Sequence, residues 1–463
     1  MSLPSELAPH VLTNAASARA VRITALPTNA STFSSGALVR IQIPRRPRAF
    51  LIPSGSFLRF DVQVNATVTT DISGTPSYAG VTFDGHASAV IDQLAMYHNS
   101  TQIETILGYN RLYNIFLESQ VCRESKVGQG QYSISGGACD TRVPSGSYLG
   151  GSSGAQVMSG VSGTPGVYSF CIPLISSLLG SGQNGNKYIP LDRLNSDLIL
   201  ELTLADFRSS FKVWTNSATT NTTWAPVTNS TYVNSTQAAS IASKISIQNV
   251  QFVGQLVELD DSAMSIYNRV TGKEVELAVT QYRGYLSSLT GPLSSASVLV
   301  PARFQSTTGL IWGFFNNAYV NDLTSGTYSW RQRANLASVS YRIGSLQYPP
   351  RPISCDGTSA EIMMELEKAL RSVSCVNGNV GFTKDEFTND TGMGAFVGMQ
   401  ELAVFPHAEG TTFAGVNTMG QNVYIDLTFT STGLPSSTYN LWCWSKYDAK
   451  ILIDETGSMR CVY

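Results

Sequence analysis

Charged side chains are scarce in this chain of 463 residues. Asp, Glu, Lys and Arg make up 13 % of it, whereas soluble domains contain about 25 %. The 30 basic and 32 acidic residues nearly cancel, so the formal net charge of −2 at pH 7 gives no overall attraction for nucleic acid. Burying hydroxyl and amide groups costs far less than burying unpaired charges. The composition therefore fits either a protein covered by copies of itself or a secreted β-protein with polar loops.

Cysteine and histidine are also few. The seven cysteines are nowhere spaced as Cys-X-X-Cys, and the four histidines are nowhere spaced as His-X-X-X-His. These absences argue against a zinc ribbon, a dense disulfide scaffold and a helical zinc site. We expect free and mostly buried thiols, as in a protein made in a reducing compartment.

Motifs of catalysis and of membrane insertion are missing as well. No Gly-X-Ser-X-Gly elbow joins a strand-like segment to a helix, no phosphate-binding Gly-X₄-Gly-Lys-Ser/Thr loop occurs, and no apolar run reaches 18 residues. Residues 1–10 lack the basic and apolar regions of a signal peptide. The carboxylate pairs Asp260-Asp261 and Asp385-Glu386 are candidates for acid–base catalysis. Adjacent residues on a strand point to opposite faces, however, so the two carboxylates of a pair are not expected to act together. We therefore predict no enzyme activity, no catalytic residue, no metal and no cofactor.

Strand-like alternation of apolar residues occurs twice, once before about residue 240 and once after it. Before it, the pattern covers residues 89–97 and 198–204; after it, residues 250–259, 310–315 and 423–429. Alternation with period two places one set of side chains on a buried face. A chain that does this twice, with little helix between, is predicted to form two packed β-sandwiches in series.

Helical patterns are short. In residues 358–371, Thr358 and Glu361 form a capping-box pattern and apolar residues recur every four positions; residues 110–118 are a second candidate. Two long stretches, 123–165 and 214–240, are rich in Gly, Ser, Thr and Asn. Loops of this length are usually functional or disordered, and we expect surface towers or contacts to neighbouring molecules.

The first 50 residues contain six arginines and a single acidic residue, Glu6, which is a local excess of five positive charges. Such a region suits contact with an anionic genome or membrane surface. The other interpretation is a solvated strand edge that carries arginines. The residues concerned are Arg19, Arg22, Arg40, Arg45, Arg46 and Arg48.

Six groups of segments occur in an order that indicates one family. Residues 252–269 run from a strand through a Leu-Asp-Asp turn into a short polar segment, and the strand-like residues 274–281 follow. Earlier in the chain, residues 90–104 precede the helical candidate at 109–117. The remaining four groups are residues 171–174 with 189–207, residues 309–312, residues 405–410 with 415–417, and residues 442–463. Together they resemble the major capsid proteins of the double jelly-roll lineage, which includes nucleocytoplasmic large DNA viruses, virophages and related smaller DNA viruses.

The resemblance implies an all-β fold of two tandem eight-stranded antiparallel jelly rolls with short helices and long loop insertions. It divides the chain into an N-terminal arm at 1–35, a first jelly roll at 36–240 and a second at 241–463, the second opening with residues 252–269. It also implies a major capsid protein whose homotrimers form pseudo-hexameric capsomers and tile an icosahedral shell around a DNA genome.

Partners follow from the same resemblance. They are further copies of the chain, penton and minor capsid proteins, and the genome or an inner membrane reached through the N-terminal region. The six arginines would then form an inward-facing basic arm. The implied location is the virion, with synthesis in the infected host cell and no signal peptide.

The alternative is a β-sandwich module that binds carbohydrate, as in an adhesin. Trp214, Trp224 and Trp330 lie in or near polar stretches, where exposed rings could stack on sugars; buried rings that fix loops onto the sandwich are the other interpretation. Selective binding on a glycan array favours the module, whereas self-assembly into particles favours the shell.

Overall fold

The computed structural model describes most of the chain. The described residues are 17–65, 78–120, 157–158, 164–180, 187–216, 225–226, 233, 235–356, 360–370, 382, 384–390, 392–404 and 414–463. The motif at 405–410 and most of the predicted long loops at 123–165 and 214–240 therefore lie outside them.

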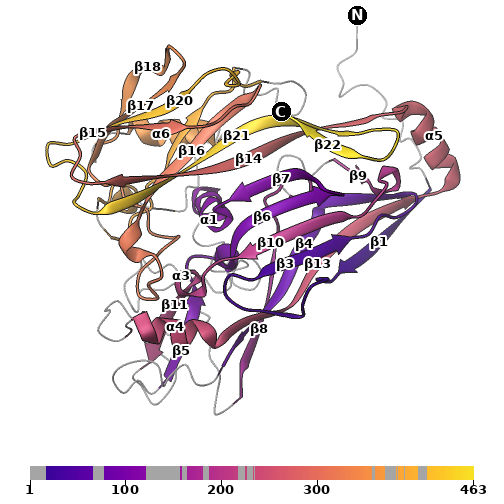
Figure 1. Ribbon diagram of the computed structural model, residues 1–463, viewed down its shortest axis with the longest axis horizontal. Helices are drawn as coiled ribbons and strands as arrows, with labels where there is room; N and C mark the ends of the chain where they lie inside the picture. The colour runs from indigo at the N-terminus through magenta and orange to yellow at the C-terminus, as the bar shows by residue number, and fades with distance from the viewer. Residues whose placement is uncertain are drawn as a thin grey trace, which may run out of the picture.

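The first half of the chain forms two sheets packed over an apolar core (Figure 1). One sheet has the order β1-β13-β4-β8, with β2 added to β13 and β9 added to β4. Its strands are β1 (Ala18–Ala25), β2 (Thr32–Phe33), β4 (Ala49–Val64), β8 (Gly166–Ile172), β9 (Ile189–Pro190) and β13 (Ile245–Leu259). The other has the order β3-β10-β6-β7, with β3 (Leu38–Ile43), β6 (Ile91–His98), β7 (Thr101–Leu107) and β10 (Leu198–Leu204).

The second half repeats this arrangement. One sheet has the order β14-β21-β16-β19, with β22 added to β21, and the other has the order β15-β20-β17-β18. The strands of the first are β14 (Val275–Thr290), β16 (Thr307–Asn316), β19 (Gly398–Glu401), β21 (Thr438–Ile453) and β22 (Met459–Val462). Those of the second are β15 (Ser295–Val300), β17 (Leu336–Ile343), β18 (Leu346–Ser354) and β20 (Val423–Phe429).

The two halves share one strand order. When β2, β5, β9, β11, β12 and β22 are set aside and the remaining strands of each half are counted along the chain, the sheets read first-eighth-third-sixth and second-seventh-fourth-fifth in both halves. All the sheet pairings are antiparallel. Two antiparallel sheets connected in this way form a jelly roll. The tandem duplication predicted from the alternating segments is therefore present.

The pairing of β13 changes the predicted boundaries. This strand lies between β1 and β4, so residues 245–259 complete the first jelly roll rather than open the second. Likewise β1, which the prediction placed in an arm at 1–35, is the first strand of that jelly roll; residues 1–16 lie outside the described part. Alternation shows that a segment is a strand but not which sheet it joins. In place of the predicted divisions we propose jelly rolls at 18–259 and 275–462.

Short helices fill the connections. They are η3 (Ala87–Val90), α1 (Tyr109–Gln120), η5 (Leu191–Arg193), α3 (Phe207–Ser210), α4 (Ser235–Ser243), α5 (Asp261–Thr271), η6 (Asn317–Tyr319), α6 (Glu361–Ala369) and α7 (Lys384–Phe387). The predicted helix at 110–118 is α1. That at 358–371 is α6, whose N-cap is Ala360. With Ala360 as the N-cap, Glu361 is the first residue of the helix and not the third, which is the position that a capping box requires. Its carboxylate accepts a hydrogen bond from the Ser354 backbone N–H at 3.1 Å, and Thr358 lies outside the described residues.

Helix α5 joins the two jelly rolls. The Asp260 side chain caps it by accepting a hydrogen bond from the Ala263 N–H at 2.8 Å, and Gly272, with a φ of +67°, ends it. A further three-stranded sheet, β12-β11-β5, is attached to the first jelly roll at the end away from α5 (Figure 1). Its strands are β5 (Tyr78–Phe83), β11 (Phe211–Asn216) and β12 (Ala225–Pro226).

Candidate functional site: the contact between the two jelly rolls

The edge strand β7 of the first jelly roll lies beside β14 and β22 of the second (Figure 1). Buried apolar residues of both halves form one continuous cluster across this contact. Because no solvent layer separates the halves there, each polar group in the contact needs a partner from the protein. The arrangement of those partners decides how firmly the two barrels are held together.

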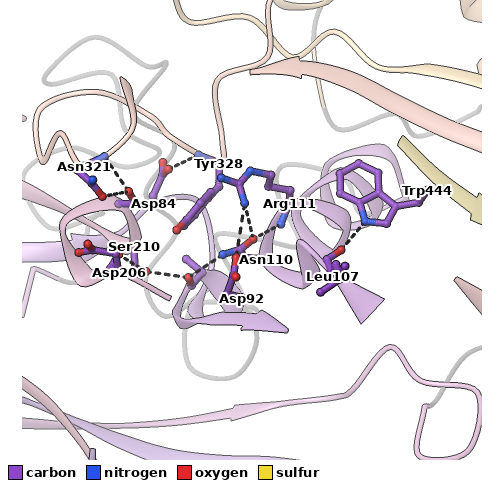
Figure 2. Close-up of polar contacts among 12 residues, drawn as sticks. Asp84, Asp92, Leu107, Asn110, Arg111, Asp206, Ser210, Asn321, Tyr328 and Trp444 are labelled. Atoms are coloured by element: carbon purple, nitrogen blue, oxygen red, sulfur yellow. Dashed lines mark hydrogen bonds and ion pairs between the residues drawn. The ribbon is translucent and has the colours of Figure 1, made fainter. Parts of the chain in front are cut away.

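Arg111, at the start of α1, is the centre of the contact (Figure 2). Its guanidinium carbon lies 4.7 Å from the ring centre of Tyr328 and 4.8 Å from that of Trp442, both in the second half. Its Nη1 lies 3.7 Å from a carboxylate oxygen of Asp92 in the first half. A guanidinium can stack on aromatic faces and pair with a carboxylate at once. The side chain therefore links strand β6 to two aromatic residues of the other barrel.

Asp84 makes a second connection. Its carboxylate accepts hydrogen bonds from the backbone N–H of Tyr328 at 2.6 Å and from the Ser329 hydroxyl at 2.5 Å. Asn114 of α1 donates to the Tyr328 carbonyl oxygen at 3.0 Å. Hydrogen bonds to a charged acceptor are roughly twice as strong as neutral ones, so residues of the first barrel fix the backbone of a loop in the second.

A buried ion pair forms the third connection. Arg331 Nη2 pairs with the carboxylate of Glu118 on α1, and the two side chains are 0 % and 3 % exposed. Arg331 also donates to the backbone carbonyl oxygens of Phe396, at 3.2 Å, and Ala395, at 3.3 Å. A charge removed from water at this depth is tolerated only when it is paired and hydrogen-bonded. The pair ties the end of α1 to two segments of the second half.

Close backbone approach makes the fourth connection. The Trp444 indole N–H donates to the Leu107 carbonyl oxygen at 2.8 Å (Figure 2), and a Cβ added at Gly284 would lie 2.5 Å from the same oxygen. Gly284 and Trp444 are paired on adjacent strands. Only glycine lets the end of β7 come this close to β14.

Glu104 is a buried carboxyl group at the same contact. It accepts hydrogen bonds from the Ser176 hydroxyl at 2.5 Å and from the Ser177 N–H at 2.8 Å. The Ser177 hydroxyl in turn accepts from Gln281 of the second barrel at 3.2 Å. Desolvation raises the pKa of Glu104 to about 7, against the lowering effect of the serine hydrogen bonds.

This raised pKa predicts a pH dependence of stability. Because the folded-state pKa of Glu104 lies above its unfolded value of 4.5, folding favours the protonated form, and this contribution is lost as the pH rises from about 4.5 to about 7. The loss corresponds to about 3 kcal/mol. Urea unfolding at pH 5 and pH 8 should show a smaller pH dependence for Glu104→Gln than for wild type. Exposed Glu274→Gln is the control; equal pH dependence in all three proteins contradicts the prediction.

The six predicted arginines do not form one cluster. Arg19 and Arg46 both pair with Glu258, at 3.7 and 3.3 Å, and Arg48 pairs with Asp261 at 2.8 Å. Together these three line one surface hollow. Their charges are therefore partly offset by the carboxylates of Glu258, near the end of β13, and Asp261, at the start of α5.

The remaining three lie elsewhere on the first jelly roll. Arg40 pairs with Glu201 at 3.4 Å, and Arg22 lies over the Phe57 ring, 5.5 Å from its centre. Arg45 Nη1 donates to the Leu194 carbonyl oxygen at 3.4 Å. Whether the six arginines face the interior of a shell stays a prediction.

The structure also shows the state of four cysteines and bears on metal-ligand groups and membrane-spanning helices. Cys171, Cys355, Cys443 and Cys461 are free, and Cys355 and Cys443 are buried. Within the described residues, no group of three His, Cys, Asp or Glu side chains is placed to hold a metal, and no helix is both long and apolar enough to cross a membrane.

The tryptophans offered for sugar stacking are not available as predicted. Trp214 and Trp330 are only 4 % and 7 % exposed, and the Trp214 indole N–H donates to the Thr82 hydroxyl at 2.9 Å. Trp224 lies outside the described residues. Two of the three rings on which the carbohydrate-binding alternative depended therefore fix the protein's own structure.

Two jelly rolls of one strand order, joined in one chain through a buried contact, define a double jelly-roll protein. Solved structures share this fold across nearly the whole chain, although no family model and no curated protein matches the sequence. The PBCV-1 virus capsid model is 12 % identical, with a TM-score of 0.61 and 98 % of each chain covered.

Two major capsid proteins are also similar in fold. That of Faustovirus is 9 % identical, with a TM-score of 0.57, and the match covers 96 % of this chain and 92 % of that one. That of mavirus is 9 % identical, with a TM-score of 0.51, and the match covers 100 % of this chain and 96 % of that one. The predicted double jelly-roll fold, and the predicted likeness to capsid proteins of that lineage, are confirmed.

Proposed function

We propose that this protein is the major capsid protein of a DNA virus. The observation that carries the proposal is the duplicated jelly roll held as one block by buried polar contacts, a fold shared over nearly full length with the capsid proteins of PBCV-1, Faustovirus and mavirus. A rigid block of two like barrels presents two similar outlines to its neighbours. Three such blocks around an axis produce a pseudo-hexagonal unit that can tile a shell.

Self-assembly is the activity in this proposal. The low content of charged residues permits much of the surface to be buried against other copies, and many weak contacts in a closed shell reinforce one another. The partners are other copies of the chain, together with penton and minor capsid proteins, and the location is the virion.

The purified protein is expected to form trimers. Light scattering after size exclusion at micromolar concentration should give the mass of three 49.8-kDa chains, and negative-stain microscopy should show hexagonal outlines. A protein that stays monomeric at that concentration argues against the proposal. Selective binding of a monomer on a glycan array supports the carbohydrate-binding alternative instead.

We further propose that arginines of the first jelly roll contact the enclosed genome or inner membrane. For the genome, each arginine that meets a phosphate releases about one counterion, so its loss lowers the salt dependence of DNA binding by about one logarithmic unit per unit of log salt. Arg22→Gln and Arg45→Gln should each show this decrease in filter-binding titrations. Arg351→Gln, on β18 of the other barrel, is the control; identical slopes in all variants contradict a genome contact.

A further inference from the structure

An apolar groove of about 840 Å³ lies beside α5, where the first and second jelly rolls meet. Phe50 of β4 and Val257 of β13 line it from the first barrel, Leu277 of β14 lines it from the second, and Tyr267 of α5 borders it. The Tyr267 ring packs edge-on against Phe50 with 4.9 Å between ring centres. A groove of this volume is within the range of about 300–1,000 Å³ for small-molecule sites.

One amine stands in this apolar lining. Lys187 Nζ donates to the backbone carbonyl oxygen of Ala278, and among the described residues it forms no ion pair with a carboxylate. The carboxylate of Glu276, which also lines the groove, pairs with Lys450 at 3.3 Å. Burial lowers the pKa of Lys187, while Asp448 acts in the opposite direction. An anion in the groove would offset the cost of placing this ammonium against apolar surface.

We propose that the groove binds a long-chain fatty acid, with its hydrocarbon chain against Phe50, Val257 and Leu277 and its carboxylate on Lys187. The apolar walls select the chain through the hydrophobic effect. The Lys187 ammonium selects a negatively charged head over a neutral one. Because the walls come from both barrels, the ligand bridges them and stabilises their contact. The inference does not depend on the proposed capsid role.

The test uses the full-length protein and a fluorescent fatty acid, dansyl-undecanoic acid. Its fluorescence should rise and saturate at one probe per chain. Palmitate should displace it, and methyl palmitate, which lacks the charge, should compete about tenfold less well. No saturable binding, or equal competition by acid and ester, overturns the proposal.

Variants locate the site. Lys187→Met should weaken probe binding about tenfold, whereas Lys273→Met, with its exposed side chain just beyond α5, should leave it unchanged. Ala18→Trp places a bulky ring at the groove from an exposed position and should also weaken binding. Circular dichroism and light scattering confirm that each variant keeps its fold and assembly state. Wild-type affinity in both Lys187→Met and Ala18→Trp shows that the probe binds elsewhere and overturns the proposal.

Discussion

Replacing Arg331 with methionine is expected to lower the free energy of unfolding by about 3–5 kcal/mol. The substitution leaves the Glu118 carboxylate buried at 3 % exposure without its charged partner. It also removes the donors to the Phe396 and Ala395 carbonyl oxygens. Urea unfolding followed by circular dichroism, at one fixed protein concentration, measures the effect.

Two further variants distinguish the loss of the ion pair from general destabilisation of the fold. Arg331→Met combined with Glu118→Leu removes both charges and should recover most of the loss, because no unpaired charge stays buried. Arg342→Met breaks an exposed pair with Asp426, 3.1 Å long, and should cost at most about 1 kcal/mol. An Arg331→Met loss no larger than that of Arg342→Met contradicts the assigned role of the pair.

Trp444→Ala should also lower the free energy of unfolding by about 3–5 kcal/mol. The side chain is fully buried and stacks on Trp442 with 5.8 Å between ring centres. Its loss leaves a cavity and removes the hydrogen bond to the Leu107 carbonyl oxygen. Because Leu107 ends β7, the damage falls on the contact between the barrels.

Hydrogen exchange locates the residues that Trp444→Ala destabilises. In Trp444→Ala the backbone amides of β7 should exchange faster than in wild type. Trp312→Ala is the control, since Trp312 is equally buried but donates to the Tyr341 hydroxyl within the second barrel; it should destabilise the protein while leaving β7 protected. If β7 exchanges at the same rate in both variants, Trp444 does not act at the contact.

The strands were predictable because alternation reports directly on burial. In β10, Leu198, Leu200 and Leu202 are buried and the residues between them are half-buried, as the sequence pattern predicts. The sheet that a strand joins is decided by contacts far along the chain. For this reason the alternation in β13 predicts a strand but not its sheet: the expected place is the second jelly roll, whereas the strand pairs with β4 and β1 of the first.

The contact between the barrels was missed for a related reason. A glutamate in a strand normally indicates a solvent-exposed position, but Glu104 lies opposite the core residue Met96 and is 3 % exposed, because Ser176 and Ser177 close over its carboxyl group. Arg331 lies in a loop, where a charged residue normally indicates solvent. One signal was present in the sequence: in a chain with so few charges, Arg111 and Glu118 are the two charged residues of an otherwise uncharged helical segment.

Among the described residues, the three-stranded sheet β12-β11-β5 belongs to the first barrel and has no counterpart on the second. In the proposed trimer it would therefore appear at alternate corners of the hexagonal outline. Turning such a unit by one-sixth of a revolution would exchange decorated and bare corners, so the two settings are distinguishable to a neighbour. In a shell built from these trimers, each trimer would therefore have a defined orientation about its three-fold axis. Lines along which this orientation changes would mark the borders between facets of the shell.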